Sequence, residues 1–414
     1  MLSTECLATF KSRFEFSPTG ESTGNLTIGR GRASGGVGQV PVPIFVAIVE
    51  NKIASGSLGA KECDKLASLF KVAAAKKSGL ALYVDSAGAR VSEGLPALGA
   101  FRYMYRAALD AAAAGVPIAA YCGANCFGGA SMLAALAGTR VYSENTRFAM
   151  SGPSILAQAA GISALDDIFM AMSMAAINGE ARSKLGDAES MLSHGGSAAL
   201  PTPVANAFAA RHASLGARLV QAKVQDISSS AQKLERKDLA KLYPEGYQVA
   251  ERNGVLSGEA MYEGRSVSVV GLIGGKLLGA ARAWAQADAL WKMLSPTPPR
   301  VLHVLVDCDS HGTSLDDERI MLSAYLADLA GALHALAQAG THIETTVLGK
   351  LGGGVYVALC APVAQVNMLY GAEIQLLPGR AIASILGDAA LQKHEFDEYK
   401  LARVADRELK LGIV

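Results

Sequence analysis

The sequence predicts an α/β protein built from two copies of one domain. Short apolar runs alternate with long stretches rich in Ala and Leu, a pattern typical of buried, largely parallel strands joined by helices. With 414 residues, the chain is longer than one hydrophobic core usually serves. The order of elements in the first half recurs in the second, which indicates an internal duplication.

The expected strands are short apolar segments bounded by Gly, Pro or polar residues. They are VPIFVAIV (42–49), LALYVD (80–85), PIAAYCG (117–123), TRVYS (139–143), SVSVVGLI (266–273), VLHVLVD (301–307) and ETTVLG (344–349). Apolar and small residues at helical spacing predict the helices. These are expected at 59–78, 95–114, 129–137, 164–178, 203–222, 279–294, 316–339 and 354–360.

The most polar long segment, with a Ser triplet at 228–230 and a dense run of charges, predicts a linker at about 225–250. The expected domains are therefore an N-terminal one at 1–230 and a C-terminal one at 245–414.

The duplication rests on matching loops in the two halves. In each half a strand leads into a polar loop, a long helix, a second strand and a Gly-Gly turn that opens a helix of small residues. DSAGARVSEG (85–94) corresponds to DCDSHGTSLDDE (307–318). Asp85 precedes Gly128 by 43 residues, and Asp307 precedes Gly353 by 46.

Composition excludes several classes of protein. The formal net charge is +1, which is unlike the basic footprint of a nucleic-acid binder. Six scattered cysteines without a C-x-x-C pair favour reduced thiols over a zinc site or disulfides. The N-terminus has no apolar signal region, and no run of about 18 apolar residues could span a bilayer. We expect a cytoplasmic protein with no metal, no nucleic-acid partner and no membrane partner.

The Gly-Gly turns are the first candidates for chemistry. Such a turn leaves backbone N–H groups unpaired at the start of the helix and lets a ligand approach closely. It can hold phosphate or the oxyanion of a thioester carbonyl, or it can simply let a helix pack tightly on a sheet. Two turns at equivalent positions favour binding. Neither matches a P-loop, and GRGRASGG (29–36) opens no helical pattern.

The polar loops carry the remaining candidates. In the first, Asp85, Arg90 and Glu93 are expected to brace the loop through ion pairs and hydrogen bonds. In the second, Ser314 or Thr313 is expected to cap a helix whose first turn holds the acidic residues 316–318.

His311 differs from these capping residues, because it stands in a Gly-flanked loop at a strand end. That position makes it a candidate for chemistry.

The first loop resembles a family signature. DSAGARVSEG is similar to the Asp-Ser-Gly-Gly-Ala-Arg-(Ile/Val)-x-Glu-Gly signature of acyl-CoA carboxylase carboxyltransferase subunits, with Ala87 in place of the first Gly. CFGGAS (126–131) and TRVYSENTRFAMSGPSIL (139–156) resemble the Gly-Gly helix and the Ser-Gly-Pro strand end of that superfamily. Within it, the chain resembles a fusion of the β subunit (25–220) and the γ subunit (255–390) of biotin-independent malonate decarboxylases.

The resemblance implies a crotonase-like fold (a ββα spiral) in both halves. It also implies a homo-oligomer with active sites between N- and C-domains, and a malonyl thioester of acyl carrier protein or coenzyme A as substrate. Paired oxyanion holes would come from amides near Gly128 and Gly129 and near Gly353, Gly354 and Val355. No cofactor is expected, because the thioester itself is the electron sink.

The resemblance gives part of the set of candidate site residues, and the rest, among them His311, Ser151 and Ser310, are candidates by location alone. The catalytic candidates are Gly128, Gly129, Gly353, Gly354, Val355, His311 and Ser151. The substrate-binding candidates are Gly88, Ala89, Arg90, Phe127, Ser310 and Gly352. The proton donor is left open among His311, Ser151 and Ser310.

Two departures from the family pattern affect the site. Ala157 and Gln158 stand where an acid usually follows Ser-Gly-Pro. SHGTSLDDE (310–318) stands where Gly, Arg and Glu are more usual.

Four functions are compatible with these residues. The first is biotin-independent decarboxylation of a malonyl thioester. The second is a carboxyltransferase that works with a separate biotin carrier, because the chain lacks a Met-Lys-Met motif and its WKML (291–294) lies in an expected helix. The third is another crotonase-like acyl-thioester enzyme: a hydratase, hydrolase or acyl transferase. The fourth is a non-catalytic scaffold.

Overall fold

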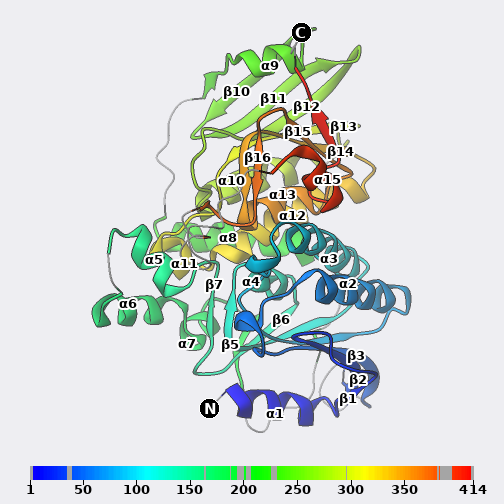
Figure 1. Ribbon diagram of the computed structural model, residues 1–414, viewed down its shortest axis with the longest axis vertical. Coiled ribbons are helices and arrows are strands. Elements are labelled where there is room, and N and C mark those ends of the chain that lie inside the picture. Colours follow the sequence, from blue (N-terminus) through cyan, green and yellow to red (C-terminus); the bar gives the residue numbers. More distant parts are fainter. Residues whose placement is uncertain are drawn as a thin grey trace. The chain divides into compact units, whose positions relative to one another are not determined.

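A computed structural model of the chain (Figure 1) describes residues 3–34, 40–162, 165–186, 188–193, 200–201, 207–224, 231–294, 296–379, 382 and 394–411. The chain forms two compact units. Unit 1 comprises Met1–Ala207 and Thr313–Ala327, and unit 2 comprises Phe208–Gly312 and Asp328–Val414. Each unit contains one sheet of mostly parallel strands with helices, which confirms the predicted α/β class.

Unit 1 is built on a sheet with the strand order β1-β2-β3-β4-β5-β6-β8, in which β7 also pairs with β5. The strands are β1 (Ser17–Pro18), β2 (Leu26–Ala33), β3 (Val42–Val49), β4 (Leu80–Ser86), β5 (Ile118–Phe127), β6 (Thr139–Tyr142), β7 (Arg147–Ala149) and β8 (Glu189–Met191). Alternate residues of β3, β4 and β5 pack against Phe10 and Phe14 of α1 (Ser3–Arg13). Helix α1 therefore covers one face of the sheet.

The other helices of unit 1 follow the strands along the chain. They are α2 (Ala60–Ala75), α3 (Leu95–Ala113), α4 (Gly129–Ala135), α5 (Pro153–Ala159), α6 (Asp167–Ile177), α7 (Gly179–Ser183) and α11 (Leu315–Arg319).

Unit 2 is built on a sheet with the order β17-β15-β14-β13-β12-β11-β10-β9, in which β16 also pairs with β14. Its strands are β9 (Gln232–Lys233), β10 (Tyr247–Arg252), β11 (Val255–Tyr262), β12 (Arg265–Leu272), β13 (Val301–Cys308), β14 (His342–Gly352), β15 (Gln365–Leu369), β16 (Glu373–Gln375) and β17 (Arg407–Leu409). Its helices include α8 (Ala207–Gln221), α9 (Lys237–Leu242), α10 (Ala280–Met293), α13 (Gly353–Cys360) and α15 (Phe396–Leu401).

The two sheets repeat one topology. The path β2-β3-β4-β5-β6-β8, with β7 beside β5, matches the path β11-β12-β13-β14-β15-β17, with β16 beside β14. Even the irregularities recur: the register shifts between Val84 and Ser86 in one sheet and between Val306 and Cys308 in the other. The predicted duplication of the fold is confirmed.

One predicted helix is wrong. The sequence predicts a single helix at 316–339, whereas α11 ends at Arg319 and α12 begins at Leu322 and runs to Gln338. Between them Met321 has a φ of +67°, a left-handed conformation that interrupts a helix. The break lies within unit 1, which includes α11 and the first residues of α12, up to Ala327.

The expected linker is also more structured than its composition suggests. Residues 232–252 form β9, α9 and β10 at the edge of the second sheet, while 225–230 lie outside the described residues. Helix α8 packs in unit 2 from Phe208 onward, although it precedes this segment. The domain boundaries 1–230 and 245–414 stay a prediction.

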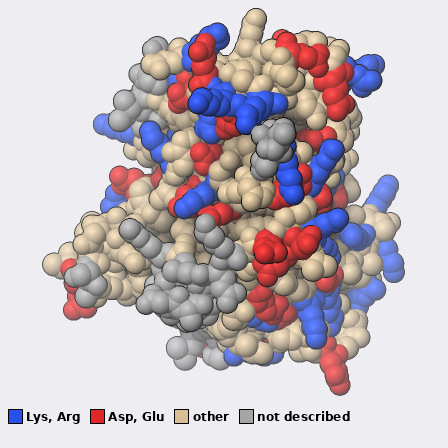
Figure 2. Space-filling view, turned by 45° about the horizontal axis from the view of Figure 1, so that its top comes forward, with Lys and Arg blue, Asp and Glu red and all other residues tan. Residues whose placement is uncertain are grey.

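The surface carries charges of both signs. Figure 2 shows Lys and Arg interspersed with Asp and Glu on the face drawn, in keeping with the net charge of +1. No helix within the described ranges is both long enough and apolar enough to cross a bilayer. All six cysteines are free and buried.

A partly buried histidine holds α8 in unit 2. His212 Nδ1 lies 2.7 Å from Asp328 Oδ2, and its Nε2 lies 3.4 Å from Asp288 Oδ1. The ring stacks on Trp284 at 5.1 Å, and Trp291 donates to the same Asp328. Burial lowers the pKa of His212, but the two aspartates more than offset this, and the pKa is raised above its usual 6.5.

The raised pKa of His212 predicts a pH-dependent contribution to stability. This contribution is fully present below pH 6.5 and is lost as pH rises through the higher native pKa. The chain has two tryptophans, both beside His212, so we expect tryptophan fluorescence to titrate with a midpoint above pH 6.5. The urea midpoint should fall over the same range. The His212→Gln variant should lose both effects, whereas His342→Gln, an exposed histidine, should keep them.

Candidate functional site

The two loops singled out in the first half meet at the ends of β4 and β5. Gly88, in the loop after β4, has a φ of +93°. A Cβ atom at this position would lie 2.9 Å from the backbone nitrogen of Gly129, at the start of α4. The Gly88 carbonyl accepts a hydrogen bond from Leu58 (2.7 Å), and Arg90 donates back to the Leu58 carbonyl (2.8 Å). Glycine is required at position 88 because the two backbones touch there.

Two backbone amides remain without acceptors at this junction. Gly88 donates to Ser86 Oγ (3.1 Å), and Gly128 donates to the carbonyls of Ala149 (3.1 Å) and Met150 (3.2 Å). Across the described part of the chain, the amides of Ala89 and Gly129 donate to nothing. Two free N–H groups on adjacent backbone segments are what an oxyanion requires.

Aromatic side chains pack around these amides. A Cβ atom on Gly129 would lie 2.5 Å from Cζ of Phe101, so this position has no room for a side chain. Phe127 is half-buried and packs with Leu315 against Ala149 and Ile177. The structure thus brings Gly88, Ala89, Phe127, Gly128 and Gly129 together, and their roles in binding and catalysis stay a prediction.

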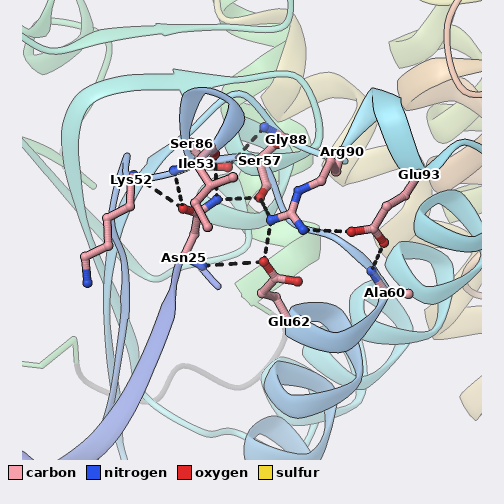
Figure 3. Close-up of polar contacts among 10 residues, drawn as sticks. All are labelled: Asn25, Lys52, Ile53, Ser57, Ala60, Glu62, Ser86, Gly88, Arg90 and Glu93. Carbon is pink, nitrogen blue, oxygen red and sulfur yellow. Dashed lines mark hydrogen bonds and ion pairs between the residues drawn. The ribbon is translucent and has the colours of Figure 1, made fainter. Parts of the chain in front are cut away.

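The charged residues of the first loop form a brace (Figure 3). Arg90 Nη1 donates to Glu93 Oε1 (2.7 Å), while its Nη2 pairs with Glu62 and donates to the Ser57 carbonyl (2.7 Å). Glu93 in turn accepts the Ala60 amide at the start of α2 (2.8 Å). Burial lowers the pKa of Arg90, but the two carboxylates more than offset this and raise it.

These are the bracing contacts expected of the first loop. Asp85 behaves similarly, since it accepts the amides of Ala124 (3.2 Å) and Asn125 (3.1 Å). Direct binding of substrate by Arg90 stays a prediction.

The brace predicts a loss of stability in one variant. The Glu62 side chain is 3% exposed, and Glu62→Gln would leave the Arg90 charge without its most buried partner. We expect a loss of about 3 kcal/mol in the free energy of unfolding, measured by urea titration. Glu180→Gln, which removes an exposed partner of Lys184, should change nothing measurable. Equal effects of the two variants would contradict the brace.

The second half places its own loops together, but differently. A Cβ atom on Gly353, which has a φ of +55°, would lie 2.6 Å from Ser310 Oγ and 3.0 Å from His311 Nδ1. The parallel bridge from Leu278 to His311 matches the bridge from Leu58 to Ala89 in the first half.

In the second half, the amide that corresponds to that of Gly129 belongs to Gly354, and His311 accepts its hydrogen bond. The Gly354 amide donates to His311 Nδ1 at 3.4 Å, and Ser310 Oγ lies 3.2 Å from the same nitrogen. Burial lowers the pKa of His311 to about 4, so the ring is neutral at pH 7. Because Nδ1 accepts, the ring proton resides on Nε2. The expected second oxyanion hole therefore has one amide bound to an imidazole, and its role stays a prediction.

The remaining candidates of the second half lie around this junction. Gly352 approaches the backbone closely: a Cβ atom there would lie 2.8 Å from the Asp309 carbonyl. Val355 is buried in α13. No cluster of three or more His, Cys, Asp or Glu suited to a metal occurs among the residues described.

One site residue escaped the sequence analysis. Ser314 caps α11 by accepting the Asp317 amide (3.1 Å), as predicted. Glu318, expected to favour the same helix start, is instead fully buried in unit 1. Its Oε1 accepts the Ser151 amide at 2.8 Å and its Oε2 accepts the Met150 amide at 3.2 Å. The sequence thus lacks an acid after Ser-Gly-Pro, but the fold places a carboxylate at this strand end.

Comparison with known proteins adds a family for part of the chain. Residues 23–187 match the carboxyl transferase domain family. A search of curated proteins finds no significant match.

Three solved structures are among those that match the chain, each with a TM-score below 0.5. The transcarboxylase 12S hexamer with hydrolysed methylmalonyl-coenzyme A is 18% identical, over 98% of this chain and 86% of that one, with a TM-score of 0.37. A malonate decarboxylase heterodimer from Pseudomonas is 24% identical, over 44% of this chain and 76% of that one, with a TM-score of 0.36. The geranyl-CoA carboxylase β subunit from P. aeruginosa is 13% identical, over 99% of this chain and 84% of that one, with a TM-score of 0.35.

The matched segment contains β2 to β7 and both loops that carry the unpaired amides of Ala89 and Gly129. Residues 23–187 are therefore similar to the carboxyl transferase domain family.

Proposed function

We propose that this chain decarboxylates a malonyl thioester, carried by acyl carrier protein or coenzyme A, to the acetyl thioester without biotin. The observation that carries the proposal is the pair of unpaired amides, Ala89 and Gly129, within the segment that matches the carboxyl transferase domain family. A cytoplasmic location and a homo-oligomeric state are part of the same proposal. Light scattering of the purified protein tests the oligomeric state.

The chemistry needs little beyond an oxyanion hole. When the bond between C2 and the carboxylate breaks, its electron pair moves into the thioester carbonyl and forms an enolate, and carbon dioxide leaves. The amides of Ala89 and Gly129 would stabilise the enolate oxygen, and each such donor lowers the barrier by about 3–4 kcal/mol. The backbone near Gly353, Gly354 and Val355 would orient the carboxylate that leaves.

A proton must then reach C2 of the enolate. With a pKa of about 4, His311 carries no spare proton at neutral pH. We assign to His311 the positioning of a water that protonates C2. Ser151 and Ser310 are alternative groups for this positioning.

A direct assay tests the proposal. The purified chain is incubated with malonyl-acyl carrier protein or malonyl-CoA, without biotin, and loss of carbon dioxide is followed by mass. Conversion on either carrier supports the proposal. No conversion on either would contradict it.

A second candidate is the carboxyltransferase subunit of a biotin-dependent carboxylase. The match of residues 23–187 to the carboxyl transferase domain family favours it. Conversion that requires an added biotinylated carrier protein would identify this activity in the same assay.

A further inference from the structure

The short helix α11 presents two of its residues to the interior of unit 1. Leu315 packs beside Phe127 and against the clusters formed by Ala149 with Ile177 and by Leu156 with Phe169. Glu318 lies three residues later, on the same side of the helix. Asp316 and Arg319 pair with each other at the surface instead. One face of α11 is therefore built into unit 1.

The Glu318 carboxylate is held as a clamp on two consecutive amides. Its two oxygens accept the N–H groups of Met150 and Ser151, at 3.2 and 2.8 Å. Arg182, also fully buried, places Nη2 3.9 Å from the carboxylate. The same guanidinium donates to the Phe148 carbonyl (2.9 Å) and to the Glu318 carbonyl (2.6 Å). Strand end and helix are thus joined by charge-assisted hydrogen bonds.

The clamped strand end in turn holds the start of α4. The carbonyls of Ala149 and Met150 accept the Gly128 amide. Ser131 Oγ, one turn into α4, donates to the Gly128 carbonyl (2.7 Å) and contacts Met150 Sδ (3.4 Å). The next amide along the chain is that of Gly129, so only Met150 and Gly128 separate the carboxylate from the candidate oxyanion hole.

An ionised carboxylate is an expensive group to bury, and burial raises the pKa of Glu318 to about 7 despite Arg182 and the two amides. An apolar residue of similar size would leave two neighbouring amides without acceptors. A Gln would turn an NH₂ group toward one of them. A carboxylate is the side chain that serves both.

We propose that Glu318 is a positioning residue: by binding the amides of Met150 and Ser151, it fixes the strand end from which Gly128 and the Gly129 amide are held. The catalytic consequence rests on the proposed function, whereas the positioning itself does not.

The first arm of the test needs no substrate. Amide hydrogen exchange is measured by mass spectrometry on the full chain for wild type, Glu318→Gln and the control Asp316→Asn, whose carboxylate is exposed on the same helix. We expect the peptides that contain the amides of Gly128, Met150 and Ser151 to exchange about tenfold faster in Glu318→Gln, with β4 and the strands of unit 2 unchanged. Unchanged exchange at these peptides, or a uniform increase across unit 1, would overturn the inference.

The second arm uses the decarboxylase assay. Glu318→Gln should lower kcat about 10- to 100-fold with KM within about twofold of wild type, because the hole is misplaced while the rest of the pocket is intact. A higher KM with unchanged kcat would also overturn the positioning role of Glu318. If Glu318→Gln does not fold, Glu318→Asp replaces it in both experiments. This variant keeps the negative charge, but its side chain is one methylene shorter, so the carboxylate oxygens lie farther from the two amides. Should wild type itself be inactive, the proposed function fails while the exchange arm still decides this inference.

Discussion

The Gly88→Ala variant is expected to lose about 100-fold or more in kcat/KM for the malonyl thioester. The new methyl group would lie 2.9 Å from the Gly129 nitrogen, closer than real Cβ contacts, and 3.1 Å from the Phe127 carbonyl oxygen, tighter than most of them. The loop must therefore move away from α4, which separates the Ala89 amide from the Gly129 amide. Steady-state kinetics with malonyl-CoA and malonyl-acyl carrier protein measure this loss.

Gly94→Ala is the matched control for this variant. Gly94 has a φ of +60° at the end of the same loop, but a Cβ atom there would meet nothing within 4 Å. Both variants bear the cost of a left-handed alanine, about 1–3 kcal/mol of stability. Only Gly88→Ala should lose activity. Equal losses of activity would show that loop strain, and not the oxyanion hole, controls the rate.

The His311→Ala variant is expected to lower kcat about 100-fold. It removes the imidazole assigned to positioning the water, and it also releases the Gly354 amide from its acceptor. Since the pKa of His311 is about 4, the wild-type profile of kcat against pH should show no inflection near 6.5 from this residue. The exposed His342→Ala is the control. A variant with full activity would remove His311 from the mechanism.

The same pKa makes His311 a source of acid sensitivity. Its native pKa lies below the usual 6.5, so the unfolded state binds more protons between pH 4 and 6.5. The stability that neutral His311 contributes above pH 6.5 is therefore lost as pH falls, by at most about 3 kcal/mol. Glu318, with a raised pKa of about 7, gives the opposite slope between pH 4.5 and 7. The His311→Gln variant should accordingly resist acid better than wild type in urea titrations at pH 7 and pH 5.

The strands predicted from sequence share a physical property that others lack. Strands β4 and β13 are buried almost throughout, so they appear as continuous apolar runs. Strands β10 and β11 pair antiparallel near the edge of their sheet, and each mixes exposed and buried residues. Their apolar pattern is therefore weak, so the sequence predicts a linker over most of β10 and no strand at β11. The break in the helix at Met321 follows from tertiary packing of α11, which no local periodicity encodes.

The residues of the candidate site also differ in whether a local sequence pattern could predict them. Gly88 and Gly129 could be found because each lies in a contiguous loop, and the duplication indicated which loops to compare. Glu318 could not, because its partner Ser151 lies 167 residues away in sequence. The acidic run at 316–318 suggested only a helix start, although Leu315 and Glu318 share the i, i+3 spacing of one helix face.

The passage of residues 313–327 into unit 1 has a consequence for biosynthesis. The ribosome releases Met150 and Ser151 well before Glu318, and all of residues 208–312 are made in between. Ser151 and Glu318 lie 167 residues apart. At about 5–20 residues per second, the amides of Met150 and Ser151 therefore spend between about 8 and 33 s without their carboxylate. The first half of the chain can collapse during that time, but its strand end cannot reach its final hydrogen bonding until the second half is more than half made. The order of translation thus ties the maturation of one unit to the synthesis of the other.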